Sequence, residues 1–469
     1  MGRKSIYQTV YNRLRYQILS GEWPIGSPLP PERKLADEWG VSRNTIVRAY
    51  GDLEAEGLIF SKIGSGRYVQ PVPPLPEGVR FQWRDQLSPY PSYMAELLSS
   101  FGKESAINFS LGDGGKHMLE ISDFQKYVKQ VAEKAESYYF LPINGHPQLR
   151  EWAVSWMGFD QVTSPEQVVI TSGSQEALQI TTAVLAEPGD AIAVEMPTYF
   201  GALQLFQSLG IRIIPIPIDR EGMNVDVLEG VLARYRPRFV YTVPTFQNPT
   251  GYTMSLARRQ RLLELSEKYG FPIVEDDAYR HLQHGAEPPA PLKSMDRQGN
   301  VIYINTFSKI LFPGLRLGWV AGSRSFIQLV TRRKELSITT NTLGQHALLS
   351  FLQDGCLPGH LERCRQLYRK QADVMGRFLD SLTPLGISFE PTAGGFYYWV
   401  SLPEGIQPKE ILKESISGGV LFAPGDMFLA RETDQPFIRL CYSYENSEQI
   451  EAGMEILTSI LRTRKEMSA

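Results

Sequence analysis

The sequence predicts a multidomain protein, with a small helical domain that carries a two-stranded hairpin followed by a large α/β domain. Three observations predict it. The chain has 469 residues, which is too long for one ordinary core. A proline-rich polar stretch covers 70–91. Beyond residue 101, short apolar runs alternate with helical segments, which is typical of a mainly parallel sheet covered on both faces. We expect domains at 1–70 and 101–469, joined by a linker at 71–100.

The composition restricts where the protein can be located and what it can bind. The hydrophobic share of 42% and the charged share of 21% are ordinary for a globular protein. The three cysteines cannot pair completely, and residues 1–20 lack the apolar core of a signal peptide. We therefore predict a reducing, cytoplasmic location. No apolar stretch approaches the roughly 18 residues that a membrane span needs, so we predict no membrane contact, and we assign no metal site.

The first 70 residues predict three helices and a hairpin. Apolar residues at helical spacing indicate a helix over 5–20. Pro31 opens a second helix that ends at Trp39, and Ser42 caps a third that runs to about Glu56. The apolar runs 58–60 and 67–69 flank Gly64-Ser65-Gly66, which predicts two strands joined by a glycine tip. Residues 1–70 carry a net charge of +3 and the remainder −6, which fits nucleic-acid contact through this segment.

This segment resembles the GntR family of winged helix-turn-helix regulators. The matching stretches are 29–33, 35–36, 41–46, 49–50, 53–54, 57–59 and 64–66. The resemblance implies binding to double-stranded promoter DNA. We expect base contacts near the start of the third helix and phosphate contacts around it. The predicted DNA-binding residues are Ser42, Arg43, Asn44, Thr45 and Arg48, with Arg33, Lys62, Ser65 and Arg67. The alternative for Arg43 is an ion pair with Asp37 or Glu38.

Five short apolar runs predict the strands of the large domain, at 168–171, 191–194, 239–242, 272–275 and 301–304. Ligand groups in such sheets gather at the carboxyl ends of the strands. Polar motifs follow every one of these runs.

Lys309 follows the last run, in Thr306-Phe307-Ser308-Lys309. A lysine that forms a Schiff base must reach its neutral form, which a desolvated or cationic site favours. Arg316 and a hydroxyl at Thr306 or Ser308 are suited to a phosphate dianion. The alternative is an ordinary surface lysine.

Asp276 and Tyr279 follow the run 272–275. A buried carboxylate keeps a pyridine nitrogen protonated, so that the ring withdraws electrons, and a tyrosine three residues later can reach the ring's phenolic oxygen. Asp277 is the rival carboxylate, and a loop or helix cap is the alternative for both.

The other runs are followed by further candidates. Asn248, beside Pro249, can donate to the same phenolic oxygen, although a simple turn explains it locally. Ser174 and Gln175 precede an expected helix at 176–185, whose N-terminus suits a phosphate. Tyr199 can stack on the ring or belong to the core.

Arg439 lies in an apolar run near the C-terminus, where a guanidinium needs an anionic partner. A substrate carboxylate would serve, and a structural salt bridge is the alternative.

In their joint order, these motifs resemble fold-type-I pyridoxal-phosphate aminotransferases of class I, across roughly 105–465. The resemblance implies Lys309 as the cofactor lysine and Asp276 at the pyridine nitrogen. It also implies dimers with the site at the interface. The remaining assignments are Asn248 and Tyr279 at the phenolic oxygen, Tyr199 stacking, Ser174, Gln175, Thr306 and Arg316 at the phosphate, and Arg439 at the substrate carboxylate. This chain has Phe140 where the family usually has a tyrosine that reaches the neighbouring subunit's phosphate; Tyr138 and Tyr139 are possible substitutes.

A GntR head on an aminotransferase body is the layout of the MocR subfamily of bacterial regulators. The resemblance implies a cytoplasmic homodimer that regulates genes of amino-acid, amine or vitamin B6 metabolism with pyridoxal phosphate. Three functions stay open. The protein senses an amine or amino acid through an external aldimine, or it senses pyridoxal phosphate itself, or it is a working aminotransferase with a DNA-binding appendage.

Overall fold

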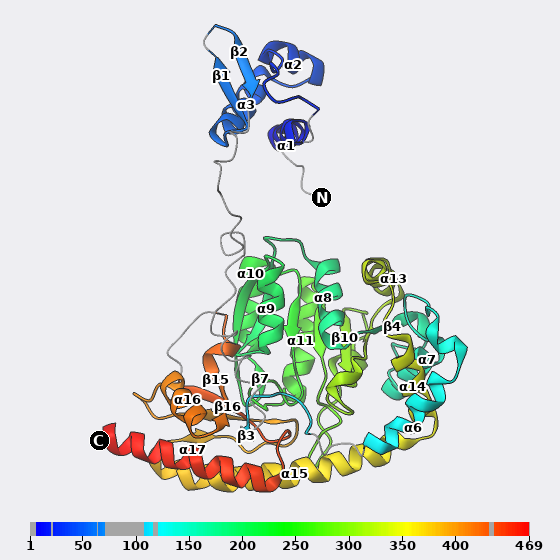
Figure 1. Cartoon of the computed structure of the whole chain (residues 1–469), viewed down its shortest axis with the longest axis vertical. Coiled ribbons are helices and arrows are strands. Elements are labelled where there is room, and N and C mark those ends of the chain that lie inside the picture. Colours follow the sequence, from blue (N-terminus) through cyan, green and yellow to red (C-terminus); the bar gives the residue numbers. More distant parts are fainter. Residues whose placement is uncertain are drawn as a thin grey trace. The chain divides into compact units, whose positions relative to one another are not determined.

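The computed structural model describes residues 6–19, 22–62, 64–70, 107–115, 121–430 and 436–468. The chain divides into two compact units, Met1–Glu96 and Leu97–Ala469 (Figure 1). We call them the head and the body. The predicted linker at 71–100 lies outside the described residues.

The head is a three-helix unit with a hairpin. Its elements are α1 (Ile6–Leu19), α2 (Glu32–Trp39), α3 (Arg43–Ala55), β1 (Ile59–Lys62) and β2 (Gly66–Val69). The strands pair antiparallel. Ser42 caps α3, because its side chain accepts a hydrogen bond from the backbone N–H of Thr45. Gly40 ends α2 in the left-handed conformation. The predicted helix-turn-helix and wing are confirmed.

The body is built on an eight-stranded sheet in the order β4-β11-β10-β9-β8-β5-β6-β7. Its strands are β4 (Val168–Thr171), β5 (Ala191–Met196), β6 (Arg212–Asp219), β7 (Gly222–Met223), β8 (Val240–Thr242), β9 (Ile273–Asp276), β10 (Val301–Thr306) and β11 (Gly318–Ala321). Neighbours from β10 through β6 run parallel, whereas β11 is antiparallel to both of its neighbours. The five predicted strands therefore end at one edge of the sheet.

Helices cover both faces of this sheet, as predicted. Successive residues of a strand point to opposite faces, so Ile192 and Val194 pack in one core and Ala193 packs in another. The first core contains residues of α8 (Ser174–Leu185), α9 (Phe200–Ser208) and α13 (Arg324–Lys334). The second contains residues of α10 (Val225–Tyr235), α11 (Leu256–Tyr269) and α12 (Leu292–Met295).

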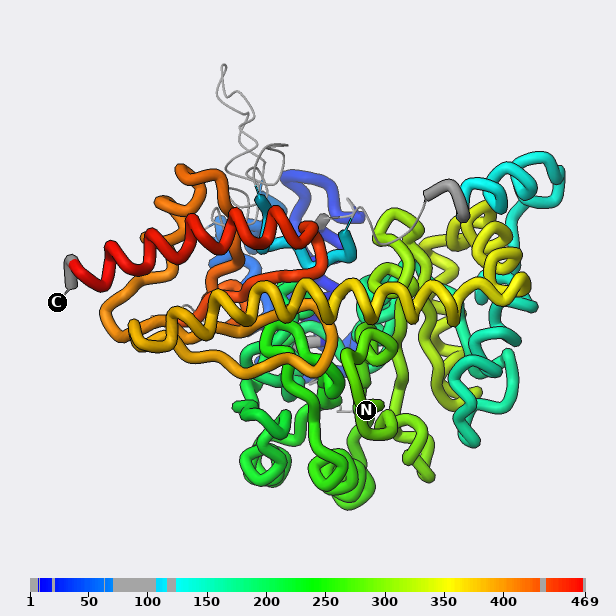
Figure 2. Tube along the Cα trace, turned by 90° about the horizontal axis from the view of Figure 1, so that it is seen from below, coloured from blue at the N-terminus to red at the C-terminus, as the bar shows by residue number. Residues whose placement is uncertain are grey.

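A third group of elements completes the body. A four-stranded sheet has the order β12-β13-β16-β15, and β3 pairs with β14. Helices α15 and α17 pack against each other and lie side by side in Figure 2. The elements are β3 (Ile107–Asn108), α6 (Ile121–Ala132), α7 (Pro147–Met157), α14 (Thr342–Gln353), α15 (Cys356–Leu382), β12 (Ser388–Phe389), β13 (Tyr397–Ser401), α16 (Pro408–Ser417), β14 (Val420–Leu421), β15 (Ala423–Pro424), β16 (Phe437–Cys441) and α17 (Ser447–Ser468).

Strand β6 is absent from the sequence prediction because it contains two prolines. Pro215 and Pro217 pair in register with Val194 and Met196 of β5. On its other side β6 pairs with β7 only through Ile218 and Asp219. A proline without an N–H is tolerated where one side of a strand is open.

Among the described residues, no helix is both long enough and apolar enough to cross a membrane.

Candidate cofactor pocket and DNA-binding surface

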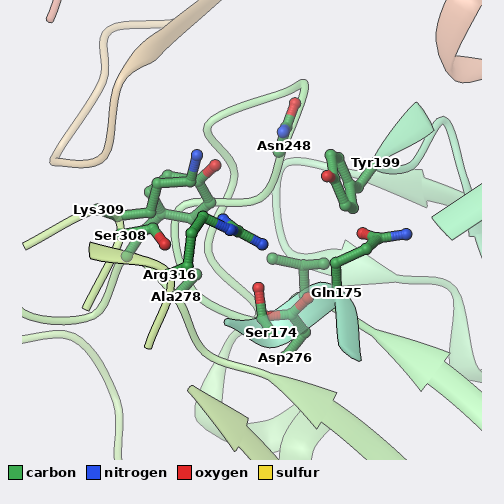
Figure 3. Close-up of a pocket in the computed structure, with 11 residues that line it drawn as sticks. Ser174, Gln175, Tyr199, Asn248, Asp276, Ala278, Ser308, Lys309 and Arg316 are labelled. Atoms are coloured by element: carbon green, nitrogen blue, oxygen red, sulfur yellow. The ribbon is translucent and has the colours of Figure 1, made fainter. Parts of the chain in front are cut away.

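A pocket lies at the carboxyl ends of β4, β5, β8, β9 and β10 (Figure 3). Its lining comes from segments up to 142 residues apart in the sequence, because parallel strands bring their ends to one edge. Every predicted cofactor residue except Thr306 lines it. The lining residues are Ser174, Gln175, Tyr199, Val243, Asn248, Asp276, Ala278, Tyr279, Ser308, Lys309 and Arg316.

The N-terminus of α8 forms an anion cradle at this pocket. Gly173 is the N-cap, with φ at 83°, and a Cβ there would lie 2.9 Å from the Arg316 guanidinium. Glycine is therefore required both by the backbone conformation and by the close approach of Arg316. Arg316 Nη2 donates to Ser172 O at 3.0 Å. Free backbone N–H groups at a helix start and a guanidinium together suit a phosphate.

Glu176 and Lys334 hold this cradle in place. The Glu176 carboxylate accepts from Ser172 N at 2.6 Å and from Lys334 Nζ at 3.1 Å. Lys334 is fully buried on α13. Burial would raise the pKa of Glu176, but the Ser172 N–H and Lys334 lower it overall. No sequence motif points to this pair, which positions the cradle and does not line the pocket.

Thr306 is the predicted cofactor residue that does not line the pocket. Its hydroxyl donates to Leu317 O at 3.1 Å and lies 3.0 Å from Ser308 Oγ. Ser308, the alternative hydroxyl, lines the pocket. The reason is local, because Thr306 is the last residue of β10 and its side chain bonds to the chain just before β11.

Asp276 is buried at the end of β9 with one carboxylate oxygen unpaired. Oδ2 accepts from the Tyr241 hydroxyl at 3.0 Å, whereas Oδ1 has no hydrogen-bond partner. Burial raises the pKa of Asp276 to about 7. The rival Asp277 does not line the pocket, and its Oδ2 accepts from Tyr303 at 3.1 Å. A buried acceptor that faces a pocket calls for a donor from a ligand.

The pKa of Asp276 predicts how the cofactor-free protein responds to pH. Because the folded-state pKa is raised, the contribution of Asp276 to stability is fully present below about pH 4 and is lost as pH rises through about 7. Asparagine does not ionise. As pH rises from about 4 to about 7, Asp276→Asn should therefore gain stability relative to the wild type, by up to about 1.4 kcal/mol per pH unit. Thermal unfolding of both cofactor-free proteins at pH 5 and pH 8 measures this.

Asp160→Asn is the matched control, because Asp160 is exposed, and it should follow the wild type at both pH values. A stability difference between Asp276→Asn and wild type that is constant with pH would contradict the raised pKa.

Lys309 is held by a carboxylate that sequence analysis missed. Its Nζ donates to Gly112 O at 2.6 Å and to Asp113 Oδ1 at 2.8 Å. Burial alone would lower the pKa of Lys309, but Tyr279 and Asp113 raise it above its ordinary value. This corrects the expectation that the site favours the neutral amine. Asp113 comes a few residues after β3, so the rule of polar residues after strands would have found it had this two-residue strand been recognised.

Two of the lining residues, Tyr279 and Asn248, bond to side chains outside the lining. The hydroxyls of Tyr279 and Tyr397 lie 2.9 Å apart. Asn248 Oδ1 accepts from Arg439 Nη1 at 2.8 Å, which leaves the amide N–H groups for a ligand. Tyr397, on β13, was also missed, because its strand comes beside Tyr279 only through the tertiary fold.

Arg439 lies on β16 just beyond this lining, joined to it through Asn248. It is 1% exposed and its Nε has no partner. Its guanidinium lies 4.3 Å from the ring centre of Tyr397 and 4.8 Å from that of Phe428. Its other bond goes to the backbone oxygen of Ser110. Within the described part of the chain, no carboxylate forms an ion pair with Arg439, so the alternative of a structural salt bridge has no partner there.

The head presents several of its predicted DNA-binding side chains to solvent. Arg33, Arg43, Asn44, Lys62 and Ser65 are exposed. No ion pair joins Arg43 to Asp37 or Glu38, all three of which the structure describes. The Ser42 and Thr45 side chains take part in the N-terminal cap of α3, where their hydroxyls lie 2.8 Å apart.

Two arginines of the head make contacts within it. Arg67, predicted to contact phosphate, forms ion pairs with Glu32 and Glu54 and lies over the Tyr50 ring. Both acidic partners already balance its charge within the head, and its contact with phosphate stays a prediction. Arg48 is exposed, and its guanidinium lies 4.3 Å from the ring centre of Tyr7.

Two family comparisons match the two units. The family "Aminotransferase class I and II" matches residues 106–457, and the family "Bacterial regulatory proteins, gntR family" matches residues 6–69. The first match covers well over half of the chain.

Three relatives share one or both parts. The uncharacterized HTH-type transcriptional regulator YisV of Bacillus subtilis is 29% identical, over 97% of this chain and 96% of its own. The probable rhizopine catabolism regulatory protein MocR of Rhizobium meliloti is 28% identical, over 89% and 86%. The crystal structure of LysN, an alpha-aminoadipate aminotransferase from Thermus thermophilus complexed with N-(5'-phosphopyridoxyl)-L-leucine, is 31% identical with a TM-score of 0.77, over 82% and 100%.

Proteins with this body fold thus hold a pyridoxyl group in solved structures. The chain belongs to the aminotransferase class I and II family and joins that body to a gntR-family DNA-binding head, which makes it a MocR-like regulator.

Proposed function

We propose that this protein binds promoter DNA through its head and senses an amine or amino acid through pyridoxal phosphate held in its body. In this proposal it regulates genes of amino-acid, amine or vitamin B6 metabolism in the cytoplasm. The observation that carries the proposal is Arg439, a buried guanidinium beside the pocket for which the described residues supply no carboxylate. An uncompensated buried charge is costly, and an amino-acid carboxylate would balance it.

The residues present fit the cofactor. The unpaired Asp276 Oδ1 is placed to accept from a pyridine N–H, and the cradle at Gly173 and Arg316 suits a phosphate. When bound, pyridoxal phosphate supplies an electron-withdrawing ring and an aldehyde carbon that reacts with amines. We assign Ser174, Gln175, Ser308 and Arg316 to the phosphate, Tyr199 to the ring face, Asn248 and Tyr279 to the phenolic oxygen, and Lys309 to the aldehyde carbon.

Exposed apolar residues support the proposed homodimer. Tyr138, Tyr139 and Phe140 are 67%, 71% and 81% exposed, and Leu336 and Ile338 are 77% and 59% exposed. Large apolar side chains that gather at a surface mark an interface. The Tyr138 hydroxyl donates to Ala132 O at 2.8 Å, so in a dimer Tyr139 is the hydroxyl-bearing neighbour of Phe140 that is better placed to approach a partner.

Removal of the Arg43 and Arg48 side chains should weaken promoter binding. Both arginines are exposed on α3, the helix that reads the major groove in this motif. Truncating a side chain that reads a base should cost roughly 1–3 kcal/mol of specific affinity. Fluorescence anisotropy with promoter DNA measures this cost for Arg43→Ala and for the double variant with Arg48→Ala.

Arg67→Ala is the informative comparison, because Arg67 is paired within the head. The substitution should lower the thermal stability of the head. It should change the preference for one DNA sequence over another much less. Unchanged promoter binding in the Arg43→Ala, Arg48→Ala variant would contradict the placement of α3. Two protected half-sites in a footprint are expected of a dimer, and a single half-site would argue against one.

The decisive test of sensing is an amine titration at saturating pyridoxal phosphate. If the protein senses an amine, the absorption spectrum and the promoter affinity should change over the same concentration range. If promoter affinity responds to pyridoxal phosphate alone and to no amine, the protein senses the cofactor itself.

A working aminotransferase is the second candidate, because the body resembles LysN at 31% identity. It predicts many turnovers of amino acid and keto acid per protein, independent of DNA. One turnover or none, with altered promoter binding, supports the sensor.

A further inference from the structure

The ion pair between Lys309 and Asp113 is a feature that cofactor binding alone does not require. Lys309 Nζ has two acceptors, the Asp113 carboxylate at 2.8 Å and the Gly112 backbone oxygen at 2.6 Å. The side chains are 21% and 32% exposed. Both acceptors belong to one short segment, which Ser443 also holds through a hydrogen bond to Asp113 O at 2.8 Å. The backbone at Gly112 and Asp113 is therefore held in place, and it positions the Asp113 carboxylate beside the Lys309 amine.

The other charged and titratable groups around Nζ come from separate elements. Tyr279, Tyr199 and Asp276 interact electrostatically with Lys309. The cations Arg316 and Arg439 interact with those tyrosines. Of these groups, only Asp113 forms an ion pair with Nζ. Burial would lower the pKa of Lys309, but Tyr279, Asp113 and Tyr199 raise it, and Asp113 is the carboxylate among these three groups.

We propose that Asp113 is the counter-ion that receives Lys309 whenever the lysine is not bonded to the cofactor, and that this ion pair holds Nζ as an ammonium so that a bound amine effector is kept rather than transformed. The inference deepens the proposed function and depends on it. Asp113 acts through Lys309 and is a positioning residue.

The first consequence concerns effector affinity. In the exchange, the carbon–nitrogen double bond to Nζ breaks and the same bond forms to the effector nitrogen. The three protons of the effector's ammonium end on Nζ, so charge and atoms balance. The ion pair exists only after this exchange, because a bonded Nζ is no longer an ammonium. An interaction made in one state alone shifts the population toward that state.

The second consequence concerns chemistry after binding. Removal of a proton from the α-carbon of an amino acid needs a general base with a free lone pair. Lys309 is the amine in the pocket lining, and as an ammonium it has none. Asp113 therefore separates sensing from turnover within a site that otherwise has the residues of an aminotransferase.

The first experiment uses the cofactor-free full-length protein and does not depend on activity. Lys309 acylation by an amine-reactive reagent is followed by mass spectrometry across pH, in wild type, Asp113→Asn and Asp113→Glu. Removal of the carboxylate should move the onset of labelling down by about one pH unit or more, whereas Asp113→Glu should stay near wild type. Asp160→Asn is the exposed control. Identical profiles for Asp113→Asn and wild type would overturn the proposal.

The second experiment titrates pyridoxal phosphate at pH 7. Lys309 of the wild type must leave its ion pair and lose protons to bind, so Asp113→Asn should bind at least about tenfold more tightly. With L-leucine as the probe, exchange of its α-hydrogen with heavy water should rise about tenfold or more in the variant. No gain in either measurement overturns the role of Asp113.

Failure of the inference and failure of the proposed function are distinguishable. If neither wild type nor variant binds pyridoxal phosphate, the proposed function fails. If both bind it with equal affinity, the proposed function stands and the role of Asp113 is overturned. If Asp113→Asn does not fold, Asp113→Ser removes the same charge. The serine variant then takes the place of Asp113→Asn in both experiments.

Discussion

Lys309→Ala should abolish the covalent attachment of pyridoxal phosphate and most of the effector response. Lys309 supplies the amine of the pocket lining, and alanine leaves the phosphate cradle intact. The wild type should show a near-visible absorption band, and borohydride should fix the cofactor to Lys309, as peptide mapping would show. The variant should keep non-covalent binding at reduced affinity and should still fold, because its side chain is a pocket wall and not part of a core cluster.

Two other lysines provide the controls. Lys268 is exposed and pairs with Glu229, and Lys293 is buried and pairs with Asp296. Lys268→Ala should behave as wild type in every assay. A borohydride adduct that maps to Lys268 or Lys293 would refute the assignment of Lys309.

Arg439→Ala should abolish the response to amino acids and leave the attachment at Lys309 intact. The guanidinium is 1% exposed, and a carboxylate brought beside it would be left without a partner after the substitution. Losing one member of a buried charged pair costs roughly 2–5 kcal/mol, which corresponds to an affinity loss of about thirtyfold or more. Spectral titration with L-leucine measures this loss, and the near-visible band reports the attachment.

A matched pair of ligands separates the carboxylate from the amine. L-Leucine and 3-methylbutylamine differ only in the carboxylate, so Arg439→Ala should weaken the first strongly and the second little. Arg324→Ala is the protein control, since Arg324 is 65% exposed on α13. Equal weakening of both ligands would mean that Arg439 supports the pocket without reading a carboxylate. An effector without an amine would move the interpretation to sensing of pyridoxal phosphate itself.

The head could be predicted almost element by element, because its signals are local. The capping serine at 42, the glycine turn at 40 and the glycine tip of the wing each determine the backbone within a few residues. The five apolar runs of the body predicted five strands for the same reason. Strand β6 was missed because its two prolines disfavour a strand. Strand β11 was missed because it begins with Gly318 and ends with Ala321, two residue types that are depleted in strands.

The sequence predicted those pocket residues that directly follow the strands of the large sheet. Asp276 and Lys309 follow parallel strands, and parallel strands bring their ends together. Thr306 and Ser308 are two residues apart, and only the hydrogen bond from Thr306 to Leu317 decides which hydroxyl faces the pocket. The sequence also does not show that Glu32 and Glu54 lie beside Arg67, because that ion-paired arrangement forms only when the head packs.

The sequence by itself determined the two-part organisation, the helix-turn-helix and wing, and the order of polar residues after the strands, because each depends on short-range backbone preferences. Only the tertiary structure decided which side chains meet. Asp113 lies 196 residues before Lys309 along the chain, yet the two form an ion pair. Arg439 reaches Asn248 across 191 residues. Such pairs form when separate sheets and helices pack, and no local pattern of residues encodes the charge that a side chain will find opposite it.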